Sequence, residues 1–72
     1  MDPYQSLANG IIVQAAEEYL FALRKLKRNP KHKKAADKRI ECEGFFQSEW
    51  FQYLTDLDGD ALMQKLHEEV FN

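Results

Sequence analysis

The sequence predicts an all-α protein, a small three-helix bundle with an additional short helix. Three observations support this fold class. Apolar residues recur at steps of three and four, which is the spacing of one helix face. Glycine and proline are scarce, with three and two copies, and polar capping residues stand just before the expected helices. A chain of 72 residues makes a single helical domain over residues 1–72. Short connections between the helices favour antiparallel neighbours.

The first helix is expected over residues 6–28. Its N-cap is either Asp2 or Ser6. Gly10 weakens the first turns by up to roughly 1 kcal/mol. Pro30 cannot continue a helix and therefore ends this one. The apolar stripe that faces other helices consists of Ile12, Ala16, Tyr19, Leu23 and Leu26.

The second helix is expected over residues 31–46, and its first turns are almost entirely charged. Lysines in a first turn oppose the helix dipole, so this segment conflicts with local helix stability and is a place to look for function. Gly44, near the end, is expected to loosen the helix or to let another backbone approach. The apolar positions are sparse: Ala36, Ile40, Phe45 and Phe46.

Two further helices complete the prediction. Ser48 is placed as the N-cap of a short helix over residues 49–54, and Asp58 as the cap of a last helix over residues 59–70. The turn between them carries Asp56, Asp58 and Asp60. The inner stripe of the last helix consists of Leu62, Leu66 and Val70, joined by Met63.

The segment from residue 45 to residue 54 is rich in aromatic residues. Phe46, Trp50 and Leu54 are four residues apart, so they are expected to share one inward face. Phe45, Phe51 and Tyr53 then point elsewhere. Exposed aromatic side chains flanked by acids are typical anchors of protein interfaces, so these three are predicted to bind a partner.

Charge is segregated along the chain. The basic segment, residues 24–39, holds nine of the ten Lys and Arg residues with one Asp, a formal charge of +8, and the rest of the chain carries −10. Three interpretations remain open: a solvated face, contact with nucleic-acid phosphates, or docking on an acidic protein. No aromatic residue lies in the segment, so base stacking is not indicated. The candidate contact residues are Arg24, Lys27, Arg28, Lys31, Lys33, Lys34 and Lys38.

Nothing in the sequence indicates catalysis, and we expect no enzyme activity, no metal and no cofactor. Cys42 is the only cysteine, which favours a reducing, cytoplasmic setting. Acids beside it raise the pKa of a thiol and argue against a reactive thiolate. A calcium loop needs glycine at its sixth position and glutamate at its twelfth, but counted from Asp56 the glycine is fourth and His67 is twelfth. His32 is expected to be a solvated polar group, and His67 lies near the C-terminus, where a cation suits the helix dipole. Neither is expected to bind a metal, which needs three or four convergent ligands.

The start of the chain, MDPYQSLANG, lacks the basic and apolar regions of a signal peptide. The nearly uncharged stretch over residues 6–16 is too short and too polar to cross a bilayer. We therefore expect a cytoplasmic protein that does not contact membranes.

Two runs, IIVQAAEEYLFALRKL at residues 11–26 and FFQSEWFQYLTDLDGDALMQKL at residues 45–66, resemble short proteins carried by phages and prophages of Gram-positive bacteria. The resemblance covers most of the chain and supplies no catalytic residue. Small acidic phage proteins of this size are similar to host-takeover and anti-defence factors, including anti-CRISPR inhibitors, which bind their targets stoichiometrically. The resemblance thus implies an inhibitor of a host complex in the host cytoplasm.

Three hypotheses follow. The first is a non-enzymatic inhibitor or adaptor that binds a host protein, such as a nucleic-acid-handling complex, through aromatic anchors and acids. The second is a small DNA-binding or regulatory protein that uses the basic segment, and the third is a homodimer formed by the aromatic face. The partner-binding residues predicted for the first are Phe45, Phe51, Tyr53, Asp56, Asp58 and Asp60.

Overall fold

Residues 3–71, the part of the chain that the structure describes, fold into four helices. The computed structural model describes the backbone of residues 3–71 and the side chains of residues 10–71, and no strand occurs within that part. The helices are α1 (Pro3–Arg28), α2 (Lys33–Phe46), α3 (Glu49–Leu54) and α4 (Gly59–Phe71). The predicted all-α class, with three long helices and one short one, is confirmed.

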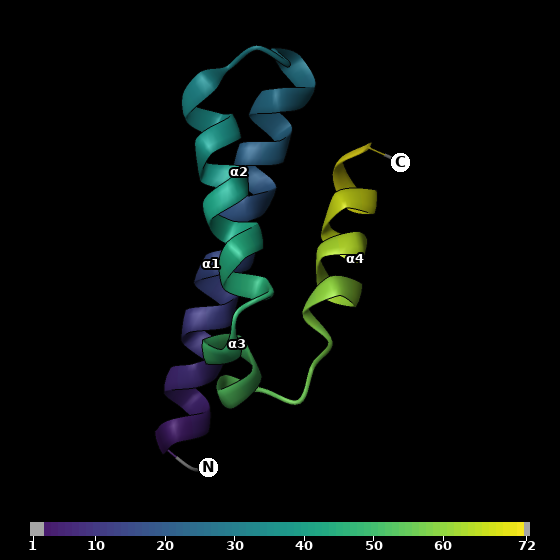
Figure 1. Ribbon diagram of the computed structural model, residues 1–72. Coiled ribbons are helices and arrows are strands. Elements are labelled where there is room, and N and C mark those ends of the chain that lie inside the picture. The colour runs from purple at the N-terminus through teal and green to yellow at the C-terminus, as the bar shows by residue number, and fades with distance from the viewer. Residues whose placement is uncertain (1–2, 72) are drawn as a thin grey trace.

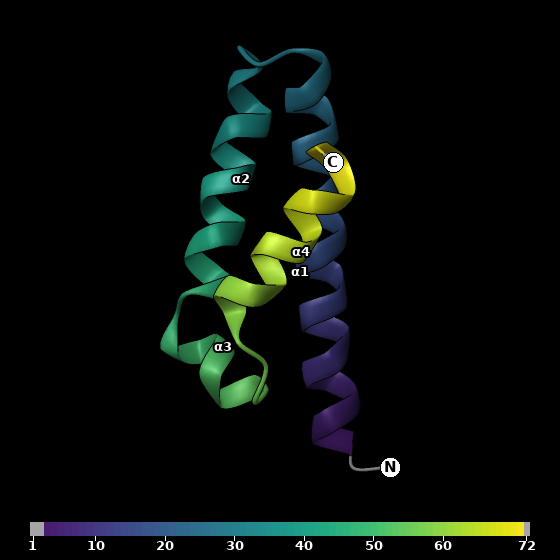
Figure 2. The ribbon, with the colours of Figure 1, turned by 90° about the vertical axis from the view of Figure 1, so that its right-hand side faces the viewer.

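The helices form an elongated bundle of 41 × 22 × 19 Å. α1 and α2 make an antiparallel hairpin, and α4 packs against both (Figure 1). Seen from the side, α4 crosses α1 obliquely (Figure 2). α3 lies at the end of the bundle opposite the α1–α2 connection. We call residues 24–34 the hairpin end and residues 49–58 the α3 end.

The connection between α1 and α2 is held by local hydrogen bonds. The Lys31 N–H donates to Asn29 Oδ1 at 3.2 Å. The Ala35 N–H donates to Nδ1 of His32 at 3.1 Å, so His32 is the N-cap and α2 begins at Lys33. The expected start at residue 31 was therefore two residues early, because the turn that follows Pro30 takes up the intervening residues. The imidazole of His32 therefore caps α2, a role that the neighbouring lysines in the sequence did not indicate.

The start of α1 excludes one of the two N-caps predicted for this helix. α1 begins at Pro3 and continues through Gly10. Ser6 therefore lies inside the helix, where it cannot be the N-cap. The other candidate, Asp2, lies outside the described residues.

The caps predicted for the last two helices are confirmed. Ser48 Oγ accepts a hydrogen bond from the Phe51 N–H at 3.2 Å and donates one to the Phe45 carbonyl at 2.6 Å. Asp58 Oδ1 accepts from the N–H groups of Asp60 and Ala61 at 3.0 and 3.4 Å. These bonds satisfy donors that a helix start leaves without partners. They also fix where α3 and α4 begin.

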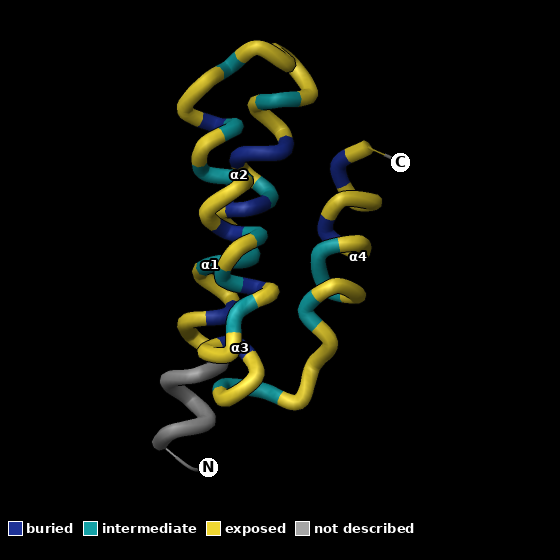
Figure 3. The backbone as a smooth tube through the Cα atoms, viewed as in Figure 1, coloured by how far each residue is buried: buried dark blue, intermediate teal, exposed yellow. Residues whose placement is uncertain are grey.

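The core fills the space between α1, α2 and α4 and extends under α3. Its rings meet mostly edge to face: Tyr19 with Phe46, and Phe46 with Phe51, each at a centroid separation of 5.7 Å. This is a favourable geometry for aromatic pairs. The buried cluster consists of Ile12, Tyr19, Leu23, Cys42, Phe46, Phe51, Leu66 and Val70. The hairpin end, by contrast, has no buried residue (Figure 3).

The inward face predicted for the aromatic segment was wrong at one position. Phe46 is buried and Leu54 packs against the core, but Trp50 is 56% exposed. Phe51 occupies the inward position and is 1% exposed. The four-residue spacing from Phe46 to Trp50 applies only to a continuous helix. The helix is interrupted between Phe46 and Glu49, and this interruption rotates α3 relative to α2.

Glycine permits a close approach at one place, and it is not Gly44. α2 is continuous through Gly44, where a Cβ would meet no other atom within 4 Å. A Cβ on Gly59 would overlap the carbonyl oxygen of Phe46. The first residue of α4 therefore packs directly on the last residue of α2, and only glycine allows this contact.

No helix within residues 3–71 combines the length and the hydropathy needed to cross a bilayer.

Candidate binding surfaces

The α3 end exposes three large apolar side chains, which we call the α3 surface. Trp50 is 56% exposed, Tyr53 is 83% exposed and Leu57 is 58% exposed. Trp50 and Tyr53 are three residues apart on α3, so they share one side of the helix. Phe51 points the other way, into the core, and anchors α3 beneath them. The two exposed rings are thus held on a short helix whose orientation is set by packing.

This arrangement changes the list of predicted aromatic anchors. Tyr53 is exposed as predicted. Phe51 is buried, so it cannot be an exposed contact, and Phe45 is half-buried with its ring against Phe46 and Phe51 at 5.6 Å. Trp50 and Leu57 were missed. The N-cap at Ser48 could have indicated the exposure of Trp50. A new N-cap begins a new helix, whose inward face need not continue that of the helix before it.

The three acids at the α3–α4 turn and the start of α4 are not equivalent. Asp58 caps α4, and Asp60 Oδ1 lies 3.5 Å from Nε2 of Gln47. Asp56 is exposed and accepts no hydrogen bond from any described residue. Glu49, in the first turn of α3, lines a shallow hollow of about 340 Å³ with Gln52 and Tyr53. Asp56 and Glu49 are therefore the acids best placed to face a partner.

The basic residues fall into two groups. Five of the seven predicted contact residues are exposed at the hairpin end, and their side chains form no hydrogen bond or ion pair with any described residue. These are Arg24, Arg28, Lys31, Lys33 and Lys34. They form a cationic tip on the molecule, with no aromatic residue among them. A neighbour, Lys25, places its ammonium over the Phe21 ring at 4.5 Å.

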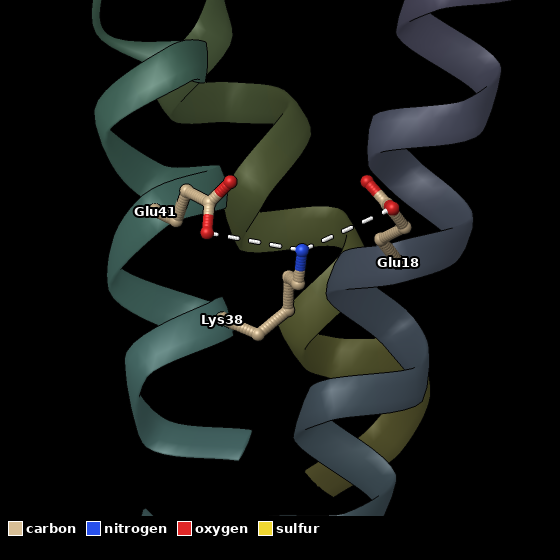
Figure 4. Close-up of polar contacts among 3 residues, drawn as sticks. All are labelled: Glu18, Lys38 and Glu41. Carbon is tan, nitrogen blue, oxygen red and sulfur yellow. Dashed lines mark ion pairs between the residues drawn. The ribbon is translucent and has the colours of Figure 1, made fainter. Parts of the chain in front are cut away.

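The other two predicted contact residues have partners within the bundle. Nζ of Lys38 lies 4.0 Å from a carboxylate oxygen of Glu18 on α1 and 3.8 Å from one of Glu41 on α2 (Figure 4). Nζ of Lys27 donates a hydrogen bond to the Val70 carbonyl of α4 at 2.8 Å. Both lysines connect helices, so neither belongs with the cationic tip. The contacts with Glu18 and Val70 were not visible in the sequence, because these partners lie 20 and 43 residues away, whereas Glu41 lies only one helical turn from Lys38.

Two titratable groups in the core, Cys42 and Tyr19, have raised pKa values, which favour their neutral forms. Burial raises the pKa of the Cys42 thiol, and the carboxylate of Glu18 raises it further. Burial also raises the pKa of Tyr19, together with the hydrogen bond that its hydroxyl donates to Glu43 Oε2 at 2.8 Å. A thiol with a raised pKa is a poor nucleophile. Both groups serve packing in this structure.

His67 stacks on the ring of Phe71 with centroids 4.5 Å apart. Among the residues whose side chains are described, no three His, Cys, Asp or Glu side chains converge in a way that would hold a metal ion.

No protein-family model, curated protein or solved structure matches this chain.

Proposed function

We propose that this protein is a non-enzymatic binding protein that docks its α3 surface on a host protein and inhibits or adapts it stoichiometrically. The observation that carries the proposal is the exposure of Trp50 and Tyr53 side by side on a helix anchored by Phe51. Tryptophan and tyrosine are the residues that most often dominate interface energies. A contiguous exposed apolar patch marks an interaction site more often than a single exposed side chain does.

The rigidity of α3 supports the same proposal. Ser48 caps the helix, Phe51 fixes its rotation and Gly59 seats the following helix against α2. Binding through a surface already held in one orientation loses little conformational entropy. Trp50 and Tyr53 can therefore contribute most of their contact energy to the complex.

The charge of the surface favours a basic partner. Glu49 and Asp56 flank the exposed rings, and the turn between α3 and α4 carries no cation. A protein surface that binds nucleic acid is positive and would attract these acids. The partner proposed is a nucleic-acid-handling protein of the host. The resemblance to phage and prophage proteins suggests a setting in the host cytoplasm and makes a defence complex of the CRISPR type one candidate.

The same acids argue against self-association through the α3 surface. A symmetric dimer places identical surfaces opposite each other. Glu49 and Asp56 of both copies would then lie close together, and like charges that face each other are destabilising. Sedimentation at several concentrations tests this directly: a dimer that Trp50→Ala dissociates would favour self-association over a host partner.

The test of the proposed function uses capture of the partner with matched variants. Wild-type protein on a resin is expected to retain a host protein from lysate, and the Trp50→Ala/Tyr53→Ala variant is expected to lose it. Ile40→Ala is the control, since Ile40 is also exposed but lies on α2. Added nucleic acid is expected to displace the captured protein. Equal capture by all three proteins would contradict the proposal.

The single tryptophan supplies a second readout with the purified partner. Because Trp50 is exposed, its fluorescence emission is expected to shift to the blue when the partner covers it. An Asp56→Asn variant is expected to bind more weakly at low salt, and the difference should shrink as salt screens the charge. An unshifted emission in a confirmed complex would exclude the α3 surface as the interface.

A second candidate function rests on the cationic tip. Five cations without a nearby carboxylate can neutralise phosphates and release counterions. This candidate predicts a low-salt complex with duplex DNA that weakens steeply as salt rises, and that Lys33→Gln/Lys34→Gln weakens further. If no complex forms at micromolar protein and low salt, DNA binding by the tip is excluded.

A further inference from the structure

A groove of about 450 Å³ opens where α1, α2 and α4 meet near the hairpin end. It lies away from the α3 surface and takes no part in the function proposed above. Its apolar lining comes from Leu23, Leu26 and Phe71, together with Pro30 and Ala36. Its ionisable lining groups are Lys27, Arg39 and His67, and no carboxylate lines it. The groove thus combines an apolar wall with basic groups.

Arg39 is the group in this groove whose hydrogen bonding is incomplete. Its Nε is buried and has no hydrogen-bond acceptor among the described residues. Glu43 is one helical turn away, but its carboxylate accepts the hydroxyl of Tyr19 and forms no ion pair with Arg39 within 4.0 Å. A half-buried guanidinium without a counter-ion is unfavourable. A carboxylate in the groove would place a counter-ion beside this guanidinium.

The other two basic groups are fixed at the edges of the groove. The hydrogen bond from Lys27 to the Val70 carbonyl holds its ammonium between α1 and α4 at 2.8 Å and leaves other N–H donors available. The stacking of His67 on Phe71 holds the imidazole beside an apolar ring. Little reorganisation is therefore needed before a ligand binds.

We propose that the groove binds a small apolar carboxylate, with its aliphatic or aromatic body against Leu23, Leu26 and Phe71 and its carboxylate on Arg39. The volume of the groove lies in the range of small-molecule sites. Arginine and a carboxylate form paired, charge-assisted hydrogen bonds. Because the lining offers cations and no anion, the groove selects an acid over a neutral molecule of the same shape.

The experiment is an NMR titration of the ¹⁵N-labelled protein with octanoate and 4-phenylbutyrate. The matched probes are their primary amides, which keep the apolar body and remove the charge. Saturable shifts are expected at the amides of Leu26, Arg39 and His67, with no response from α3. The primary amides are expected to bind about tenfold more weakly or worse, the usual loss for a charged hydrogen bond. Absence of saturation by both acids at millimolar concentration, or equal binding of acid and amide, would overturn the proposal.

Two variants that each remove one positive charge distinguish binding of the acids in the groove from their general attraction to cations. Arg39→Gln is expected to weaken binding of the acids by about tenfold without lowering the unfolding midpoint, because it removes a half-buried charge that forms no ion pair with a described residue. Arg28→Gln, at the exposed tip, is expected to leave binding unchanged within about twofold, as expected for a screened surface charge. Equal losses in both variants would overturn the site.

An Arg39→Lys variant and a peptide ligand provide two further tests. If Arg39→Gln does not fold, Arg39→Lys keeps the charge and removes the buried Nε donor. It is expected to bind the acids several-fold more weakly in a folded protein, and unchanged affinity would count against Arg39 as the anchor. A peptide with an apolar C-terminal residue that binds the groove when both free acids fail would make it a protein-docking site and would overturn the assignment to a small ligand.

Discussion

The α3 end and the hairpin end present exposed side chains in different ways. At the α3 end, Trp50 and Tyr53 stand on a helix whose opposite side, at Phe51, is buried in the core. At the hairpin end, no residue from 24 to 34 is buried, and the exposed groups are mostly cations. One surface is oriented by packing, whereas the other is defined by charge.

This difference determines what each end can recognise. Rings in a fixed orientation favour a partner of matching shape, and the energy of that contact changes little with salt. Cations on flexible stems attract any polyanion at a distance, and salt weakens that attraction. The α3 end is therefore suited to specificity and the hairpin end to steering. The predictions that follow test this division, from the largest expected effect to the smallest.

The two sides of α3 should respond to truncation very differently. Phe51→Ala leaves a cavity in the aromatic core and is expected to lower the free energy of unfolding by about 4 kcal/mol. Trp50→Ala is expected to change it by less than about 0.5 kcal/mol, as for other exposed positions. Urea unfolding followed by circular dichroism measures both. Comparable losses in the two variants would mean that α3 is not anchored through Phe51.

The seating of α4 should depend on Gly59 and not on Gly44. Gly59→Ala forces a Cβ onto the Phe46 carbonyl, and we expect a loss of about 3 kcal/mol from overpacking. Gly44→Ala places a methyl group in open space within α2 and is expected to raise stability by up to about 1 kcal/mol. Thermal unfolding of the pair gives the sign of each change. A stable Gly59→Ala variant would refute the close contact between α2 and α4.

Alkaline pH should reveal the burial of Tyr19. The folded-state pKa of Tyr19 is raised above its ordinary value of 10.0. The unfolded chain therefore loses this proton first, and stability present below pH 10.0 falls as pH rises above it. The fall attributable to Tyr19 approaches about 1.4 kcal/mol per pH unit. Urea midpoints between pH 9 and pH 11 are expected to fall less steeply in Tyr19→Phe than in wild type. Tyr53→Phe, at an exposed site, serves as the control and should follow wild type.

The hairpin end should gain stability when its charge is reversed. Lys33 and Lys34 occupy the first turn of α2, where positive charge opposes the helix dipole. Lys33→Glu and Lys34→Glu are each expected to raise the free energy of unfolding by about 0.5 kcal/mol at low salt. Lys65→Glu, inside α4, is the control and should give no gain. If the two variants lose stability instead, the tip lysines contribute contacts beyond those in this structure.

Local sequence signals predicted most of the fold. The fold class, the extent of α3 and the caps at Ser48 and Asp58 follow from periodicity and capping preferences, which depend on residues a few positions apart. The end of α1 at Arg28 follows from Pro30 in the same way. The prediction was wrong for Trp50 and Phe51. It assumed that the helical spacing of α2 continues into α3, and this placed Trp50 in the core and Phe51 on the surface.

Contacts between residues far apart in the chain could not be predicted from the sequence. Lys38 faces Glu18 across two helices, and Lys27 reaches Val70 at the end of α4. The prediction grouped both lysines with the other cations because Glu18 and Val70, their partners on other helices, lie far from them in the sequence. The groove at Arg39 has the same origin, since three helices contribute its lining. Spacing within one helix cannot reveal a site that exists only after the helices pack.

The bond between Lys27 and Val70 affects how the bundle opens. α4 has no basic residue in its last turn, so nothing in its own sequence offsets the negative end of its dipole. Lys27 supplies that cation from α1. Fraying of α4 from its C-terminal turn must therefore break a link to a helix 43 residues away in the sequence. Amide protons in the last turn of α4 should accordingly exchange with solvent more slowly than those of an unsupported helix end.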